Sequence, residues 1–193
     1  RLLAELSASF VNLSAEQIEP QIDSSLKMLV EFLGNHRSTL IEFCEDQLHV
    51  QVTHSYAVAE CEPFPLGPFA IDRLPWFIGQ FRSGKVVFVR SVPNDLPPEA
   101  AKEKQYCATH DIKSNVAIPL KFAGSVLGAI TFAFLRQRCE WPVEIISRLQ
   151  LIGEVFANAI LRRRADEALR AALAENQKLR QRLEQENLYL REQ

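Results

Sequence analysis

Residues 114–135 read SNVAIPLKFAGSVLGAITFAFL and carry the clearest β-strand pattern of the chain. Two β-rich runs, Asn115–Lys121 and Val126–Leu135, flank the turn sequence Ala123-Gly124-Ser125, a pattern that predicts a β-hairpin. Side chains alternate between the two faces of a strand. One face of this hairpin carries bulky residues: Val116, Ile118, Leu120, Ile130, Phe132 and Phe134. The other face carries small residues: Asn115, Ala117, Ala129, Thr131 and Ala133. We expect the bulky face to fill a core beneath helices and the small face to leave room for a concave ligand site.

The segment that follows the hairpin predicts one long helix. Between Val143 and Gln193 there is no proline and a single glycine, and the segment is rich in Leu, Ala, Glu, Arg and Gln, which are strong helix formers. Beyond Leu161 the composition turns polar, and a heptad pattern with a/d spacing begins. Its positions are Ala165, Leu169, Ala172, Asn176, Leu179, Leu183, Glu186 and Leu190. We therefore expect a globular domain over residues 1–161 and a coiled-coil linker over residues 162–193.

A polar helix with such a heptad needs a second helix to pack on. An asparagine at an a position, as at Asn176, favours two parallel strands in a coiled coil. In this register Glu175 at g lies within reach of Arg180 at e of the other chain. The sequence therefore predicts a parallel homodimer through the terminal helices.

The residues before the hairpin alternate between helical and β-rich patterns. Two helices are expected first, a short one starting at Leu2 and an amphipathic one over Ala15–Leu33, which Ser14 and Gln17 can cap. The next expected elements are strands Thr39–Phe43 and Leu48–His54, a loop Glu60–Pro75, a helix Leu74–Arg82, a strand Lys85–Arg90 and a helix Pro98–Thr109. The predicted fold class is α+β, with a central, mostly antiparallel sheet and the N- and C-terminal helices on one face.

Composition argues against several classes of protein. The formal net charge is -2 and the pI is about 6.1, whereas a nucleic-acid-binding surface usually shows a basic excess. No apolar run reaches the ~18 residues that span a bilayer, and the first residues lack the apolar core of a signal peptide. The cysteines are widely spaced, at Cys44, Cys61, Cys107 and Cys139. We expect a cytoplasmic fragment of a longer protein that contacts neither nucleic acid nor membrane.

No motif predicts catalysis in this segment. Gly79–Val86 imitates a phosphate-binding loop, but Val86 stands where a hydroxyl is needed, and the order of helix and strand is reversed. The histidines show no metal-ligand spacing. Cys107 and His110 are three residues apart on a predicted helix and could meet, yet a half-buried cysteine beside a solvated histidine is the simpler interpretation. We expect no enzymatic activity and no metal site, and no cofactor is indicated.

Several motifs resemble the GAF domain, a small-molecule sensory fold related to PAS. Ser114-Asn-Val-Ala-Ile-Pro-Leu and Gly124-Ser-Val-Leu-Gly-Ala-Ile-Thr-Phe are similar to the family's paired last strands, within a resemblance that covers Leu2–Leu161. Leu74-Pro-Trp and Arg82-Ser-Gly-Lys resemble a bacterial subgroup of these sensors. The resemblance implies a domain that senses a small molecule. The adjacent Cys-His pair of bilin-binding members is missing, which argues against a phytochrome-like photoreceptor.

The end of the chain carries a second resemblance. Gln185-Glu-Asn-Leu-Tyr-Leu-Arg-Glu resembles the segment that enters the AAA+ domain of sigma-54-dependent transcriptional activators, the bacterial enhancer-binding proteins. This implies a regulatory GAF domain that transmits effector binding through a dimeric coiled coil to a downstream AAA+ ATPase. Arg163-Arg-Ala-Asp-Glu-Ala-Leu-Arg resembles linkers both of these activators and of sensor histidine kinases. A GAF sensor of a histidine kinase and a ligand-free dimerisation module are the alternatives.

The expected effector site lies between the small face of the hairpin and the segment Phe69–Asn115. Its candidate ligand-binding residues are Arg73, Trp76, Arg82, Tyr106, Asn115 and Thr131. Arginine holds planar carboxylates well, so Arg73 or Arg82 is expected to meet a carboxylate of the effector, if it carries one. The predicted partner at this site is an unidentified small-molecule effector. The strand Val126–Leu135 is the expected relay, because it can touch the site and leads into the long helix.

Overall fold

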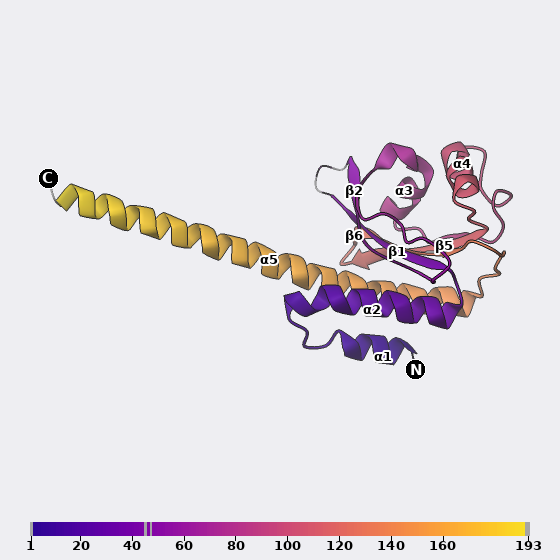
Figure 1. The fold of residues 1–193 in the computed structure, drawn as a ribbon, viewed down its shortest axis with the longest axis horizontal. Coiled ribbons are helices and arrows are strands. Elements are labelled where there is room, and N and C mark those ends of the chain that lie inside the picture. The colour runs from indigo at the N-terminus through magenta and orange to yellow at the C-terminus, as the bar shows by residue number, and fades with distance from the viewer. Residues whose placement is uncertain (1, 45, 47, 192–193) are drawn as a thin grey trace.

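A computed structural model of the chain describes residues 2–44, 46 and 48–191, and a six-stranded antiparallel sheet with the order β3-β2-β1-β6-β5-β4 lies at its centre. The strands are β1 (Arg37–Phe43), β2 (His49–Ala57), β3 (Gly67–Ala70), β4 (Val87–Val89), β5 (Ser114–Phe122) and β6 (Ser125–Phe134). The helices are α1 (Leu2–Ser9), α2 (Ala15–Leu33), the short 3-10 helix η1 (Ile71–Arg73), α3 (Pro75–Arg82), α4 (Ala101–Thr109) and α5 (Val143–Arg191). Figure 1 shows α1, α2 and the first part of α5 on one side of the sheet, with α3 and α4 on the other.

Both predicted hairpins are present, and they lie side by side in the sheet. The first is β1–β2 and the second is β5–β6, and they join because β1 pairs with β6 in antiparallel register. In that register Arg37 lies opposite Ala133, and Thr39 lies opposite Thr131. The predicted α+β fold class, with an antiparallel sheet and the terminal helices on one face, is confirmed.

A short edge strand corrects one expectation. The sequence predicts a loop over the whole of Glu60–Pro75, but β3 pairs with β2 there, and η1 follows it. Pro68 lies within β3 and has no N–H to donate, which an edge strand tolerates because one side of it has no neighbouring strand. Pro68 is therefore compatible with this strand because of the strand's place at the edge of the sheet.

The bulky face of the second hairpin packs beneath the terminal helices, as predicted. The helices contribute these fully buried side chains: Leu6, Ile18, Ile22, Leu26, Leu29, Phe156 and Ile160. The N–H of Ser14 donates to Oε1 of Gln17 at 2.9 Å, which confirms the predicted capping pair. Gly34 ends α2 with a φ of +68°, a left-handed conformation that glycine adopts without strain.

The entry into α5 is tied to the sheet through Trp141. Its ring packs edge-on against Phe134, with ring centroids 5.5 Å apart. Its Nε1 donates to Oγ of Ser114 at 3.0 Å, and that hydroxyl donates to the carbonyl of Val89 at 2.8 Å. The residue two positions before α5 therefore contacts the first residue of β5 and the last residue of β6.

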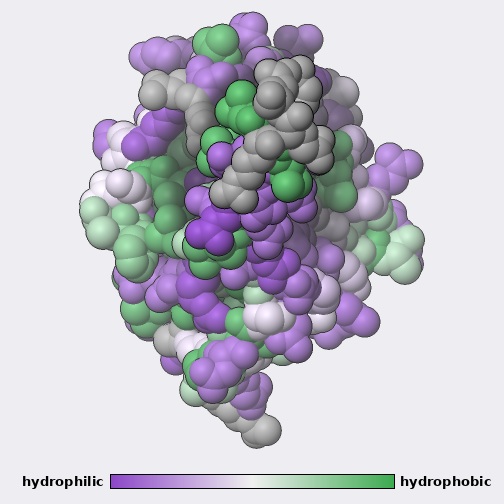
Figure 2. All heavy atoms as spheres, turned by 90° about the vertical axis from the view of Figure 1, so that its left-hand side faces the viewer, coloured by the Kyte–Doolittle hydropathy of each residue, from purple (hydrophilic) through white to green (hydrophobic). Residues whose placement is uncertain are grey.

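The long helix α5 leaves the domain and continues well beyond it (Figure 1). Its 49 residues span about 74 Å at ~1.5 Å per residue. Exposed leucines occur along the projecting part: Leu169, Leu173, Leu179, Leu183, Leu188 and Leu190. Figure 2 views this helix end-on, with hydrophilic and hydrophobic residues mixed on the visible surface. Within the described residues, no helix combines the length and the apolar character needed to cross a bilayer.

Candidate ligand-binding site

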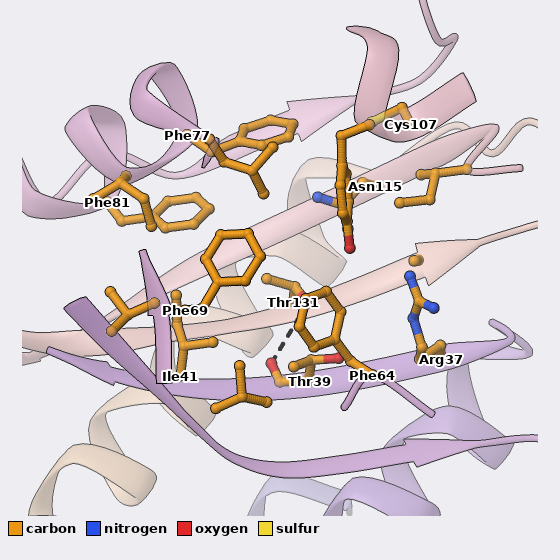
Figure 3. Close-up of a pocket in the computed structure, with 17 residues that line it drawn as sticks. Arg37, Thr39, Ile41, Phe64, Phe69, Phe77, Phe81, Cys107, Asn115 and Thr131 are labelled. Atoms are coloured by element: carbon orange, nitrogen blue, oxygen red, sulfur yellow. Dashed lines mark hydrogen bonds between the residues drawn. The ribbon is translucent and has the colours of Figure 1, made fainter. Parts of the chain in front are cut away.

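A cavity of about 80 Å³ lies between the sheet and the segments that connect the two hairpins (Figure 3). Its floor comes from β1, β2, β5 and β6: Arg37, Thr39, Ile41, Val50, Val52, Asn115, Thr131 and Ala133. Its cover comes from the loop before β3, from β3 itself, and from α3, α4 and the residues next to them: Phe64, Phe69, Leu74, Phe77, Ile78, Phe81, Tyr106, Cys107 and Ile112. This cavity lies where the small face of the hairpin predicted a concave site.

The strand register explains why there is space above Ala133 in the floor of the cavity. Arg37, Ala133 and Asn115 form one row across β1, β6 and β5. Neighbouring strands are ~4.8 Å apart, so the backbones of Arg37 and Asn115 are separated by ~10 Å. Between them only the methyl group of Ala133 rises from the sheet. The gap above this alanine can therefore hold a group bound from both sides.

The two ends of the cavity differ in chemistry. Figure 3 shows Phe69, Phe77 and Phe81 toward one end, and Arg37 and Asn115 toward the other. The rings of Phe77 and Phe81 are nearly parallel, with centroids 6.1 Å apart. The cavity therefore suits a molecule with an apolar body and a polar group at one end.

Arg37 brings a buried positive charge to the polar end. Its side chain is 8% exposed. Its Nη1 donates to the carbonyl of Glu62 at 3.5 Å, and its guanidinium lies 5.8 Å from the ring centre of Phe64. Among the described residues, no carboxylate forms an ion pair with it. A buried charge without a counter-charge is costly in free energy, so this arginine is poised to accept an anionic group.

The other polar groups of the cavity are neutral. Burial raises the pKa of the Tyr106 phenol to about 12, although the charge of Arg37 opposes this rise. Burial also raises the pKa of the Cys107 thiol to about 12, so it stays protonated at neutral pH. The hydroxyl of Thr131 donates to the carbonyl of Thr39 at 3.5 Å. These groups can donate hydrogen bonds, but they do not neutralise Arg37.

The structure divides the candidate ligand-binding residues into two groups. Tyr106, Asn115 and Thr131 line the cavity, whereas Arg73, Trp76 and Arg82 do not. Arg73 stacks on the outer side of Phe69, 4.6 Å from its ring centre, and lines a separate surface hollow. The guanidinium of Arg82 lies 5.4 Å from the ring centre of Phe43.

Trp76 belongs to the packing of the cover. Its backbone N–H donates to the Glu103 carboxylate at 2.8 Å, which fixes the start of α3. Its ring lies beside Phe77, with centroids 5.4 Å apart. Neither Arg73 nor Arg82 lines the cavity, because Arg73 stacks on Phe69 and Arg82 stacks on Phe43 of β1. Their expected contact with an effector carboxylate stays a prediction.

Arg37, which supplies the charge in the cavity, is not among the site residues predicted from the sequence. This residue lies two positions before the predicted strand Thr39–Phe43, while the observed β1 begins at Arg37 itself. Residues at steps of two share a face of a strand. Extending the strand by one step would have placed Arg37 on the same face as Thr39 and Ile41, beneath the cover.

An antiparallel sheet with terminal helices on one face and a covered cavity on the other is the architecture of a sensory α+β domain that binds small ligands. The chain belongs to the GAF family, since the GAF domain model matches residues 17–160. GAF domains are small-molecule-sensing modules of signalling proteins. No curated protein sequence matches the chain significantly.

Solved structures agree on the fold at low sequence identity. The phycocyanobilin-bound GAF domain from a cyanobacterial phytochrome is 18% identical, with a TM-score of 0.72 over 86% of this chain and 94% of that one. The blue-light absorbing form of the Thermosynechococcus elongatus PixJ GAF domain is 11% identical, with a TM-score of 0.64 over 85% and 96%. The chromophore-binding domain of Stigmatella aurantiaca bacteriophytochrome is 12% identical, with a TM-score of 0.66 over 83% and 59%. At these identities the likeness concerns the fold.

Proposed function

We propose that this GAF domain is a regulatory sensor that binds a small effector in the cavity above Asn115 and Thr131 and passes a change to α5. One observation carries the proposal: β6 lines the cavity and then leads directly into the long helix. A bound molecule would contact Thr131 and Ala133 on β6. The chain then reaches Trp141, whose hydrogen bond to Ser114 ties the start of α5 to the sheet.

A second connection supports transmission through β1. Arg37, Thr39 and Ile41 face the cavity from one side of this strand. Glu42 points to the other side and holds Arg163 of α5 at 2.8 Å. A ligand shifts an equilibrium only when it binds two arrangements with different affinities. A shift of β1 toward a ligand would change this contact, so the two arrangements would differ where α5 leaves the domain.

A small effector suits this cavity better than a bilin. One of the structures above is a phycocyanobilin-bound GAF domain and another is a chromophore-binding domain. Pockets for drug-sized ligands usually occupy about 300–1,000 Å³. The cavity here is about 80 Å³. Its cysteine, Cys107, is a protonated thiol because its pKa is about 12, whereas a thiolate is the reactive form.

The projecting helix supports a parallel homodimer and a downstream partner domain. Leu169, Leu179, Leu183 and Leu190 are exposed and occupy a or d positions of the heptad. The resemblance of residues 185–192 to the entry of the AAA+ domain supports a sigma-54-dependent activator, in which the segment has no catalytic activity of its own. A histidine-kinase sensor shares such linkers and is the second candidate. The cavity disfavours a ligand-free dimerisation module.

Filling the cavity tests the sensor proposal. We expect Thr131→Trp to abolish the thermal stabilisation that an effector, found by screening small molecules, gives the wild-type domain. Thr109→Trp is the matched control, because Thr109 is exposed on α4 and lies outside the cavity. A folded Thr131→Trp variant that keeps full affinity would place the site elsewhere. If a ligand binds but leaves crosslinking between two Leu183→Cys chains unchanged, the proposal that binding passes a change to α5 is contradicted.

A further inference from the structure

We propose that the cavity selects a small monocarboxylate with an apolar tail, whose carboxylate lies above Ala133 between Arg37 and Asn115. This inference rests on the proposed function and names the ligand class of the same site. The effector need not be anionic for the domain to be a sensor, so the two claims can fail separately.

The charge of Arg37 is the first argument. A guanidinium has five N–H donors and no acceptor. Its neighbours here are the Glu62 carbonyl, the Phe64 ring and the Tyr106 phenol, which are all uncharged. Buried charges in proteins are usually paired. A carboxylate bound to the guanidinium would supply the missing counter-charge through a bidentate, charge-assisted contact.

Asn115 is the second argument, because it lies across the gap from Arg37. Its side chain is 8% exposed and lines the cavity. Among the described residues it has no side-chain hydrogen-bond partner. An amide NH₂ can donate to an anionic oxygen. With Ala133 between the two residues in the same row, one carboxylate can be reached from both sides.

The rest of the cavity selects a single negative charge and a short apolar tail. Ile41, Val50, Val52, Phe69, Phe77 and Phe81 form the end away from Arg37. One buried guanidinium balances a monoanion, whereas a phosphate dianion would keep an excess negative charge in an apolar site. A dry cavity of about 150 Å³ can hold benzene. At about 80 Å³ the present one suits a short-chain carboxylate or, after a small opening of the cover, a single ring.

Matched pairs of acid and amide test this directly. We would titrate the wild-type chain with butyrate and butyramide, with benzoate and benzamide, and with inorganic phosphate, using calorimetry at near-neutral pH. We expect at least one carboxylate to bind at least about tenfold more tightly than its amide, which is ~1.4 kcal/mol, because hydrogen bonds between charged groups are stronger than those to a neutral amide. We expect phosphate to bind more weakly than that carboxylate.

Arg37→Met should remove the preference for the acid, because it keeps an unbranched chain of similar length without the charge. Arg73→Met is the matched control: this arginine lies outside the cavity, and the preference should persist. Asn115→Leu, which has a side chain of similar size, should weaken carboxylate binding several-fold. It replaces Arg37→Met as the test variant if Arg37→Met does not fold. Arg37→Lys should retain part of the preference, because the charge remains while the bidentate geometry is lost.

Several results would overturn the inference. These are equal affinity for acid and amide, preference for phosphate, failure of both carboxylates to bind at millimolar concentration, or an acid preference that survives Arg37→Met. If an amide binds and Thr131→Trp abolishes that binding, the cavity is a sensor site for neutral molecules, and only the anion inference fails. If Thr131→Trp alters the binding of every ligand no more than Thr109→Trp does, the proposed function fails as well.

Discussion

Both carboxylate oxygens of Glu42, on β1, accept a hydrogen bond from Nη2 of Arg163, on α5, at 2.8 Å. Nη2 of Arg164 also donates to this carboxylate, at 2.6 Å. Glu42 is 4% exposed and lies on the face of β1 opposite Ile41, which lines the cavity. The strand that forms part of the ligand site therefore also holds the helix at the point where it leaves the domain. Glu19 of α2 forms an ion pair with Arg163 as well, and Nε2 of His54 on β2 lies 2.8 Å from Oε2 of Glu19.

Removing Arg163 should destabilise the domain. Arg163→Met deletes one cation from a buried pair and leaves Glu42 with Arg164 alone, so we expect a loss of about 3 kcal/mol in the free energy of unfolding. Urea denaturation followed by circular dichroism measures this. Arg170→Met is the matched control, because Arg170 pairs with Glu16 at the surface and should change stability little. Equal effects of the two substitutions would contradict a structural role for the Glu42 contact.

Removing Arg37, unlike removing Arg163, should not lower the stability of the ligand-free domain. Its buried charge lacks a counter-charge among the described residues, so Arg37→Met removes a desolvation penalty and replaces the charge with a side chain that packs in an apolar site. We expect an unchanged or higher melting temperature. Differential scanning fluorimetry without ligand measures it. A clear loss of stability would show that the contacts of Arg37 with Glu62 and Phe64 outweigh the cost of burying its charge.

Alkaline pH should destabilise the domain through Tyr106 and Cys107. Burial raises the pKa of each to about 12, from the ordinary values of 10.0 for a tyrosine phenol and 9.0 for a cysteine thiol. As pH rises past 9, the unfolded chain loses these protons while the folded domain keeps them, so the free energy of unfolding falls until the folded groups also titrate. Each group contributes a slope of up to about 1.4 kcal/mol per pH unit.

Urea denaturation at several pH values between 8 and 11 would measure this slope. Tyr106→Phe and Cys107→Ala should each reduce it, and the double variant should reduce it most. Below pH 8 the same substitutions should leave the pH dependence unchanged, because both groups are then protonated in either state. A slope that is the same in all variants would show that these groups are not buried.

The projecting helix should dimerise through its heptad. Leu183→Glu places a charge at an a position and should shift the chain toward monomer at micromolar concentration, because the seam of a coiled coil requires apolar contacts. Leu173→Glu is the matched control, since Leu173 is also exposed but lies outside the predicted a and d positions. Light scattering distinguishes the two. A wild-type chain that is monomeric at tens of micromolar would contradict the dimer.

Much of the architecture followed from local patterns. The alternation of bulky and small residues over 115–134 predicted which face of the second hairpin is core and which is open, and the structure confirms both faces. The long helix followed from its composition and from the absence of proline. Both features depend on the composition and the spacing of residues within one segment, so they can be predicted without knowing which other segment packs against it.

The set of polar residues that line the cavity depends on contacts between segments distant in sequence. Arg73 and Arg82 lie within the segment Phe69–Asn115 that was expected to cover the site, but Arg73 stacks on Phe69, Arg82 stacks on Phe43, and neither lines the cavity. Arg37 is distant in sequence and enters the site because β1 pairs with β6, which brings it into one row with Ala133 and Asn115. The edge strand β3 likewise exists only because β2 offers it a partner. The physical reason is the same in each case: local sequence determines the type of an element and its faces, whereas pairing between distant strands determines which side chains meet.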